Sequence, residues 1–326
     1  MTVALAVGAL TATALVGCSG DAKPKVSGTR APTSTVAPTN PLTGLGPSPK
    51  GPVIAVKVDD TAAGRPSLGL DKADVIYIEE VEGGLSRMVA VFASARPRVR
   101  AVRSIRASDM ELLGQYGRII VVASGGKPSS LRTLDQSTLR SSINDRGQVG
   151  FSRDSTRPAP YNVVSDLAKV SASIKADGVR NVGFRWAARD PRLARAKAAP
   201  SVRTQVGSTR VRFTWNAKLG RYVRTVDGQR VVTASGAPVA KPNVLVQFCT
   251  ITPDPQDVDV NKNPTMLTKS VGAGRVVLFR NGKRIEGKWS RPGLDAPTKL
   301  VDVAGKPLLL APGGTFVALV RPGTPV

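Results

Sequence analysis

The chain has 326 residues, room for about two domains, and its 41% apolar content is typical of a globular protein. Lys and Arg outnumber Asp and Glu by 47 to 23, and a net charge of +24 favours acidic lipid headgroups, anionic cell-wall polymers or nucleic acid as partners. The chain contains no histidine, which excludes catalytic triads and metal sites that depend on it. With two cysteines and no Cys-x-x-Cys motif, we expect no metal site and no cofactor.

The N-terminus combines an uncharged apolar run, residues 2–17, with a cysteine. The run is short for a transmembrane helix but has the length of a signal-peptide core. It ends in Leu15-Val16-Gly17-Cys18, which resembles a bacterial lipobox, where the cysteine becomes lipidated after export. No basic residue precedes the run, so we expect the natural chain to begin upstream of Met1.

We therefore predict that residues 1–18 are a lipoprotein signal peptide and that Cys18 carries diacylglycerol and a palmitate-type acyl chain. The protein would be anchored to the cell membrane, on its extracytoplasmic face, where nucleic acid is not an expected partner. The alternatives are a plain secretory signal or a buried helix. Residues 19–52 are rich in Pro, Thr and Ser and cannot bury enough apolar surface to fold, which predicts a disordered tether.

Residues 53–184 mix strand-like and helix-like segments and predict a mixed α/β domain. Gly83-Gly84 indicates a hairpin between two strands, and Ser108 is the expected N-cap of a short helix. The expected strands are Val53–Val58, Asp74–Val81, Met88–Phe92 and Ile119–Ala123, and the expected helices are Ser108–Leu113, Ser129–Leu139 and Val163–Ile174.

Residues 185–205 form an Ala-, Arg- and Pro-rich connection to a second domain, residues 206–326, which we expect to be smaller and mainly antiparallel β. The fold class predicted for the whole chain is therefore α+β. Cys249 ends an apolar strand and reads as a core cysteine. The aromatic residues Trp215, Tyr222 and Trp289 fill the core of the second domain or stack on sugar rings.

A first candidate site is acidic. Asp59 and Asp60 end one strand, and Glu82 follows the next, so their carboxylates could meet at one edge of a sheet. Two carboxylates can perform acid–base chemistry on a sugar or hold a hard cation. The alternative is that these residues only pair with arginines.

A second candidate site is basic and would bind an anion. Arg103 and Arg106 belong to a run of five arginines, and guanidinium groups bind phosphate and carboxylate with two hydrogen bonds. Gly125-Gly126 follows the central strand and could present backbone N–H groups to the same anion. Arg153 lies in a further charged loop. The alternative for Arg103 and Arg106 is a solvated loop, and the alternative for Gly125-Gly126 is a tight turn without a ligand. Arg153 could equally only brace its own loop.

The chain resembles the YerB-like bacterial lipoproteins, a family classed as a domain of unknown function. The resemblance implies a lipoprotein with two domains and no established activity. Members often carry His where this chain has Ala123 and Tyr161, so chemistry that used those histidines would be lost here. The motifs occur in order between about Pro41 and Pro322: Asn40–Gly44, Val56–Asp60, Arg65-Pro66, Gly69-Leu70, Ala73–Tyr77, Glu82–Gly84, Arg87, Val102–Ser104, Arg106, Ser124–Gly126, Phe151, Arg153-Asp154, Arg157, Pro160–Asn162, Asn281-Gly282, Gly287–Trp289 and Pro312–Thr315.

The leading hypothesis is a non-enzymatic, membrane-tethered protein that binds an anionic cell-envelope component, either a wall polymer or lipid headgroups. The groove would be lined by Arg103, Arg106, Arg153 and Gly125-Gly126. One alternative is a hydrolase acting on cell-wall glycan or its phosphates, with Asp59, Asp60 or Glu82 as catalytic carboxylates. Another alternative is a structural or assembly partner of other envelope proteins.

Overall fold

A computed structural model describes residues 39–326, the side chains of residues 255 and 256 excepted. The expected signal peptide, Cys18 and the tether up to residue 38 lie outside this part. The rest of the segment predicted as a disordered tether, residues 39–52, is not disordered throughout, because Asn40 and Leu42 are buried and the Leu42 N–H donates to the Asn40 side chain at 2.9 Å. No helix in the described part has the length and apolar character needed to cross a membrane. About 14% of the residues are in helices and about 43% are in strands, so the protein is mostly β with few helices.

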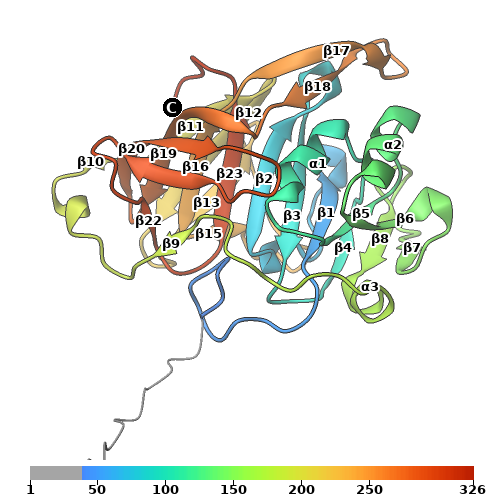
Figure 1. The fold of residues 1–326 in the computed structure, drawn as a ribbon, viewed down its shortest axis with the longest axis horizontal. Coiled ribbons are helices and arrows are strands. Elements are labelled where there is room, and N and C mark those ends of the chain that lie inside the picture. Colours follow the sequence, from blue (N-terminus) through green and yellow to red (C-terminus); the bar gives the residue numbers. More distant parts are fainter. Residues whose placement is uncertain (1–38) are drawn as a thin grey trace, which may run out of the picture. The chain divides into compact units, whose positions relative to one another are not determined.

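A mixed sheet of eleven strands runs through the centre of the molecule (Figure 1). Six of its strands are buried at every position, because layers cover both faces of the sheet: β1 (Ile54–Asp59), β2 (Val75–Glu80), β3 (Ser86–Phe92), β5 (Ile120–Ala123), β16 (Asn243–Phe248) and β23 (Thr315–Val320). The strand order is β10 (Lys197–Ala198), β20 (Lys283–Arg291), β19 (Gly272–Arg280), β16 (Asn243–Phe248), β23 (Thr315–Val320), β2 (Val75–Glu80), β3 (Ser86–Phe92), β1 (Ile54–Asp59), β5 (Ile120–Ala123) and β6 (Arg140–Ile143), with β21 (Lys299–Asp302) pairing with β20.

The two halves of the sequence meet inside this sheet. β2 pairs in parallel with β23, the last strand of the chain, from Val75 opposite Thr315 to Ile78 opposite Ala318. β23 also pairs in parallel with β16, so this junction departs from the antiparallel pattern expected for residues 206–326. The predicted segments 53–184 and 206–326 therefore contribute strands to one continuous sheet.

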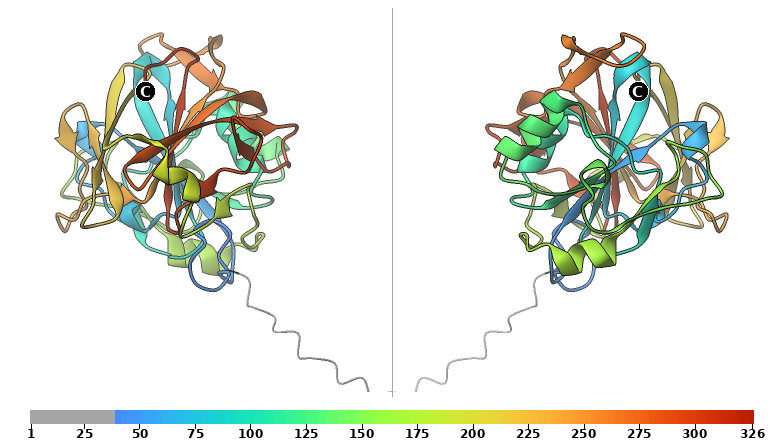
Figure 2. Two further views of the ribbon diagram at one scale, coloured as in Figure 1. Left: turned by 90° about the vertical axis from the view of Figure 1, so that its left-hand side faces the viewer. Right: turned by 90° about the vertical axis from the view of Figure 1, so that its right-hand side faces the viewer.

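Separate layers cover the two faces of the central sheet, and the two turned views in Figure 2 show them on either side of its strands. On one face, Leu113 of α1 and Leu134 of α2 enter the core. On the other face, Phe213 of a second sheet and Leu167 of α3 do the same. The elements of these layers are α1 (Ala107–Gly114), α2 (Pro128–Gln136), α3 (Leu167–Ser173), and the second sheet of β11 (Ser201–Val206), β12 (Thr209–Asn216), β13 (Arg221–Val226), β14 (Gln229–Arg230) and β15 (Ala240–Lys241).

Three small sheets complete the described part. β17 (Ile251–Val258) and β18 (Pro264–Thr268) form a hairpin. β4 (Arg98–Arg100), β8 (Val163–Asp166) and β7 (Phe151–Arg153) form a three-stranded sheet, and β22 (Leu309–Leu310) pairs with β9 (Arg185–Trp186). The Gly83-Gly84 hairpin is present, because β2 and β3 pair antiparallel across a 3-10 turn, Glu82–Gly84.

Two local predictions were wrong. The helix expected over Val163–Ile174 begins as strand β8, because this segment pairs with β4 and β7, and it turns helical only after Asp166, whose side chain caps α3. The N-cap of α1 is Arg106, and Ser108 lies inside the helix. There Asp109 accepts a hydrogen bond from the Arg106 backbone N–H at 2.7 Å, which satisfies the helix start without Ser108.

The aromatic residues and Cys249 lie in the core of the C-terminal half. Trp289 is buried and donates its indole N–H to the carbonyl of Phe248 at 2.9 Å. Tyr222 is buried with its ring 5.1 Å from that of Trp215. Burial raises the pKa of the Cys249 thiol to about 12, so this cysteine is an inert core residue.

Candidate functional site

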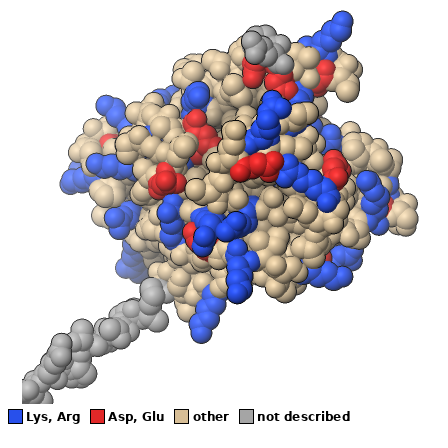
Figure 3. Space-filling view, turned by 45° about the vertical axis from the view of Figure 1, so that its right-hand side comes forward, with Lys and Arg blue, Asp and Glu red and all other residues tan. Residues whose placement is uncertain are grey.

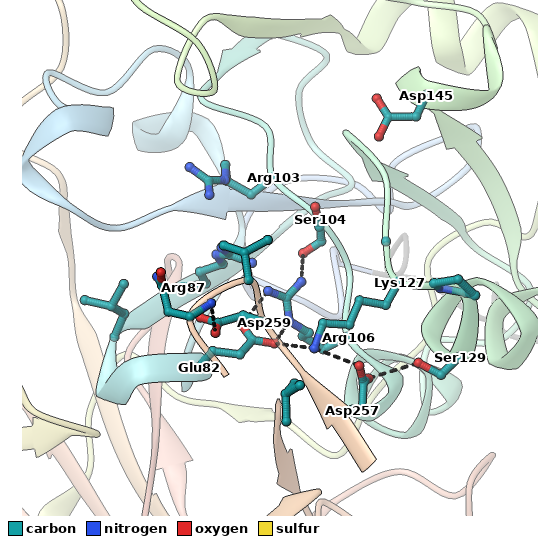
Figure 4. Close-up of a pocket in the computed structure, with 16 residues that line it drawn as sticks. Glu82, Arg87, Arg103, Ser104, Arg106, Lys127, Ser129, Asp145, Asp257 and Asp259 are labelled. Atoms are coloured by element: carbon teal, nitrogen blue, oxygen red, sulfur yellow. Dashed lines mark hydrogen bonds and ion pairs between the residues drawn. The ribbon is translucent and has the colours of Figure 1, made fainter. Parts of the chain in front are cut away.

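A cleft of about 850 Å³ lies where the β2–β3 turn, the start of α2 and the β17–β18 hairpin approach one another (Figure 4). Strand ends and a helix N-terminus form its floor, and the hairpin forms one wall. The lining residues are Glu82, Leu85, Arg87, Arg103, Ser104, Arg106, Gly126, Lys127, Pro128, Ser129, Asp145, Asp257, Val258, Asp259, Val260 and Asn261.

Arg106 and Glu82 form a buried ion pair at the centre of the cleft. The guanidinium donates from Nε and Nη2 to the two carboxylate oxygens, both at 2.5 Å, and the Thr265 hydroxyl adds a third hydrogen bond at 2.8 Å. Burial favours a raised pKa, but the hydrogen bonds and charge of Arg106 outweigh it and lower the pKa of Glu82 to about 2. Glu82 is therefore ionised at neutral pH and does not serve as a proton donor.

Arg103 faces the cleft from the segment between β4 and α1. Its Nη1 lies 3.1 Å from the Asp59 carboxylate, and its guanidinium lies 5.3 Å from the ring centroid of Tyr161. The other oxygen of Asp59 accepts hydrogen bonds from the backbone and hydroxyl of Thr61, at 2.7 and 2.5 Å. Asp59 is therefore a structural partner of Arg103 rather than a free carboxylate.

Arg87, on β3, is a cation of the cleft without an ion pair among the described residues, whereas Arg103 pairs with Asp59. It is only 9% exposed, and its Nη1 is buried without a hydrogen-bond partner among the described residues. The nearby carboxylates Asp59 and Glu82 are bound by Arg103 and Arg106 instead. Burial, followed by the charges of Arg106 and Arg103, lowers the pKa of Arg87 to about 10. The guanidinium is still charged at neutral pH, and no carboxylate among the described residues forms an ion pair with it.

Lys127 joins the start of α2 to the β17–β18 hairpin. Its ammonium group lies 2.7 Å from the Asp257 carboxylate and 4.0 Å from Glu82, and it donates a hydrogen bond to Thr265 at 3.0 Å. The hydroxyl of Ser129 donates to the other oxygen of Asp257 at 2.9 Å. These contacts hold the hairpin against the helix and fix one wall of the cleft.

The glycines predicted to bind an anion lie at or beside the cleft. Gly126 lines it directly. Gly125 packs against Asp145 so closely that a Cβ atom there would lie 2.0 Å from a carboxylate oxygen. The start of α2 has no side-chain cap, so the N–H groups of its first turn are not satisfied by the capping residue, Lys127.

Four predicted site residues are not part of the cleft lining: Asp59 and Gly125, whose contacts are given above, and Asp60 and Arg153. Asp60 forms a buried bidentate pair with Arg224, at 2.6 and 2.5 Å, beneath the second sheet. Arg153 is exposed and donates to Asn162 at 2.9 Å, so it braces its own loop. The structure thus brings Arg103, Arg106 and Gly126 together with Glu82, and leaves Asp60 and Arg153 outside.

Sequence reasoning missed Arg87 and Asp257 as site residues. Arg87 carried a weak signal, because it follows the Gly83-Gly84 turn in a strand whose other residues are mostly apolar, so its side chain had to be buried. Asp257 carried none, because its contacts with Lys127 and Ser129 span more than a third of the chain. Across residues 39–326, no group of three carboxylates or cysteines is placed to hold a metal ion.

The N-terminal domain model of a protein of unknown function, DUF3048, matches residues 42–180, and the C-terminal domain model matches residues 201–317. The chain therefore belongs to the family of proteins built from these two domains. The cleft is formed by both matched segments, since Arg87 and Arg103 come from the first and Asp257 from the second.

One relative in this family is a Bacillus subtilis (strain 168) protein named "Putative lipoprotein YerB", which is 27% identical over 296 residues, 86% of this chain and 85% of the relative. The fold also matches a crystal structure of the YerB protein from Bacillus subtilis, with a TM-score of 0.71 and 23% identity. That match covers 86% of this chain and 96% of the other.

Proposed function

We propose that this chain is a lipoprotein, tethered by a lipid on Cys18 to the extracytoplasmic face of the membrane, whose cleft binds an anionic group of a cell-envelope component. The lipobox-like run before Cys18 and the name of the relative in Bacillus subtilis support the anchor. The buried guanidinium of Arg87, whose Nη1 has no hydrogen-bond partner within residues 39–326, is the observation that supports the binding role.

A buried charge without a partner costs free energy, so a site that keeps one is primed for a ligand of opposite sign. A phosphate or carboxylate group could accept two hydrogen bonds from Arg87. The nearby guanidinium of Arg103 and the positive end of the α2 dipole would stabilise the same anion. Acidic and basic side chains are interspersed on the face seen in Figure 3.

The three carboxylates predicted to be catalytic favour binding over hydrolysis. Asp60 and Glu82 are held in buried ion pairs, and Asp59 is hydrogen-bonded to Thr61 and paired with Arg103. A glycoside hydrolase needs one carboxyl group that is protonated and one that is free to attack or to activate water. Neither role suits a carboxylate whose oxygens are already bound by an arginine.

The test is titration of the purified chain with methyl phosphate, a small phosphate ester, at low and high salt. We expect salt-sensitive binding that weakens at least about tenfold in Arg87→Gln, because the variant loses one charge-assisted pair. The control is Arg153→Gln, which removes an exposed arginine outside the cleft lining and should bind as the parent chain does.

The stability of Arg87→Gln separates a ligand-binding role from a structural one. Removing an unpaired buried charge should leave the melting temperature unchanged or raise it, whereas loss of a structural ion pair would lower it. Absence of binding by the parent chain, or equal binding by Arg87→Gln, would reject the proposed site.

A further inference from the structure

The mouth of the cleft carries exposed apolar side chains. Leu85 is 47% exposed, Val258 is 42% exposed and Val260 is 99% exposed, and all three line the cleft. Only eight large apolar side chains in residues 39–326 are exposed, so three of eight gather at one site. Single exposed apolar residues need no explanation, but a cluster beside a buried cation does.

The hairpin is built to present part of this cluster. The carboxylate of Asp259 accepts hydrogen bonds from the backbone N–H groups of Asn261 and Asn263, at 2.9 and 2.8 Å, and from the Asn263 amide at 3.2 Å. These bonds shape the turn in which Val260 points to solvent. Because Asp257 is bound by Lys127, the turn is held beside the cleft.

Leu85 joins this apolar cluster from the β2–β3 turn rather than from the hairpin. It directly follows the Glu82–Gly84 turn, two residues before Arg87 on the same chain segment. The Leu85 N–H donates to the Glu82 carbonyl at 3.3 Å, and the Leu85 carbonyl accepts from Val81 N–H at 2.8 Å, so its backbone is fixed. The cleft therefore combines the buried guanidinium of Arg87 with an apolar rim, and hydrogen bonds hold the backbone of that rim.

From this combination we propose that the ligand is a lipid phosphate, a phosphate ester of a long alkyl or isoprenoid chain. The inference rests on the proposed function of the cleft. The phosphate lies against the guanidinium groups of Arg87 and Arg103, and the first carbons of the chain lie along Leu85, Val258 and Val260. A water-soluble phosphate would gain nothing from this rim, whereas the start of a lipid chain buries apolar surface there.

The experiment compares two phosphate monoesters that differ only in their apolar part: methyl phosphate and octyl phosphate, the latter below its micelle-forming concentration. We expect the parent chain to bind octyl phosphate roughly tenfold or more tightly, because the alkyl carbons are removed from water. The double variant Leu85→Ser with Val260→Ser should lose this preference and keep its affinity for methyl phosphate. Both side chains are exposed, so the fold should tolerate the changes.

Val303→Ser is the matched control, since Val303 is 78% exposed and lies outside the cleft lining. It should retain the parent preference. Equal affinities of the parent chain for the two esters, or an unchanged preference in the double variant, would overturn the lipid assignment and leave anion binding intact. Failure of the parent chain to bind either ester would overturn the proposed function itself.

Discussion

Several of the arginines that give this chain its high net charge are internal hydrogen-bond donors rather than surface charges. Arg280 and Arg291 are fully buried and donate mainly to carbonyl groups of distant segments, such as those of Leu309 and Glu111, both at 2.8 Å. Each binds loops to the central sheet, and their hydrogen bonds satisfy most of the buried donors. Arg87 differs because no such acceptor reaches its Nη1 in the described part.

Glu82 should make stability depend on pH. Its folded-state pKa of about 2 lies below the ordinary value of 4.5, so the stabilisation is complete above 4.5 and is lost as the pH falls towards 2. Between pH 5 and pH 3 we expect the parent chain to lose about 2 kcal/mol more unfolding free energy than Glu82→Gln. Denaturant unfolding at each pH measures the difference.

A suitable control for that prediction is Glu286→Gln. Glu286 forms exposed ion pairs with Arg275 and Arg284, which contribute little to stability. This variant should follow the pH dependence of the parent chain. If Glu82→Gln followed it as well, the depressed pKa of Glu82 would be wrong.

At the scale of elements, the connection between the two halves is fixed by a close backbone contact. Gly183 has φ +105°, and a Cβ atom there would lie 1.8 Å from the carbonyl oxygen of Thr298. The Thr298 N–H donates to the Val182 carbonyl at 3.0 Å, just before β21. Only glycine can adopt this backbone conformation and leave room for that carbonyl.

We therefore expect Gly183→Ala to lower the unfolding free energy by about 3 kcal/mol or more, because strain and a steric clash add together. Gly293→Ala provides the comparison, since its φ is ordinary and no atom lies within 4 Å of the place that its new methyl group would take. It should change stability by less than about 0.5 kcal/mol. Similar midpoints for the two variants in urea unfolding would contradict the tight contact at Gly183.

At the scale of the whole molecule, the pairing of β2 with β23 makes the two family segments one structural body. Val317 and Ala318 of β23 are buried between β2 and β16, so removing either half would expose the middle of the sheet. The ion pair between Asp60 and Arg224 adds a second buried link between the halves. The stability of the folded protein therefore depends on both halves together.

The expected consequence is a single cooperative unfolding transition. Far-ultraviolet circular dichroism, which follows the strands, and fluorescence of Trp186, Trp215 and Trp289 should give one common midpoint. Two separated transitions, one for each family segment, would show that the shared sheet does not couple them.

The sequence alone determined features that depend on local pattern. Runs of β-branched residues predicted β1, β2 and β5, because such side chains favour a pleated, buried strand. The glycines of the β2–β3 turn predicted a hairpin, and the lack of histidine excluded whole classes of chemistry. Arg103, Arg106 and Gly126 were also foreseen near one another, since they follow neighbouring segments of the same half.

Only the tertiary structure decided which charged side chains form ion pairs with each other. Asp60 meets Arg224 and Glu82 meets Thr265 across more than 160 residues, and no local periodicity predicts contacts at that separation. The same is true of the β17–β18 hairpin that closes the cleft and of the β2–β23 junction. Burial and pairing are properties of the packed whole, so only the fold could show that Arg87 is a buried cation without an ion pair in the described part of the chain.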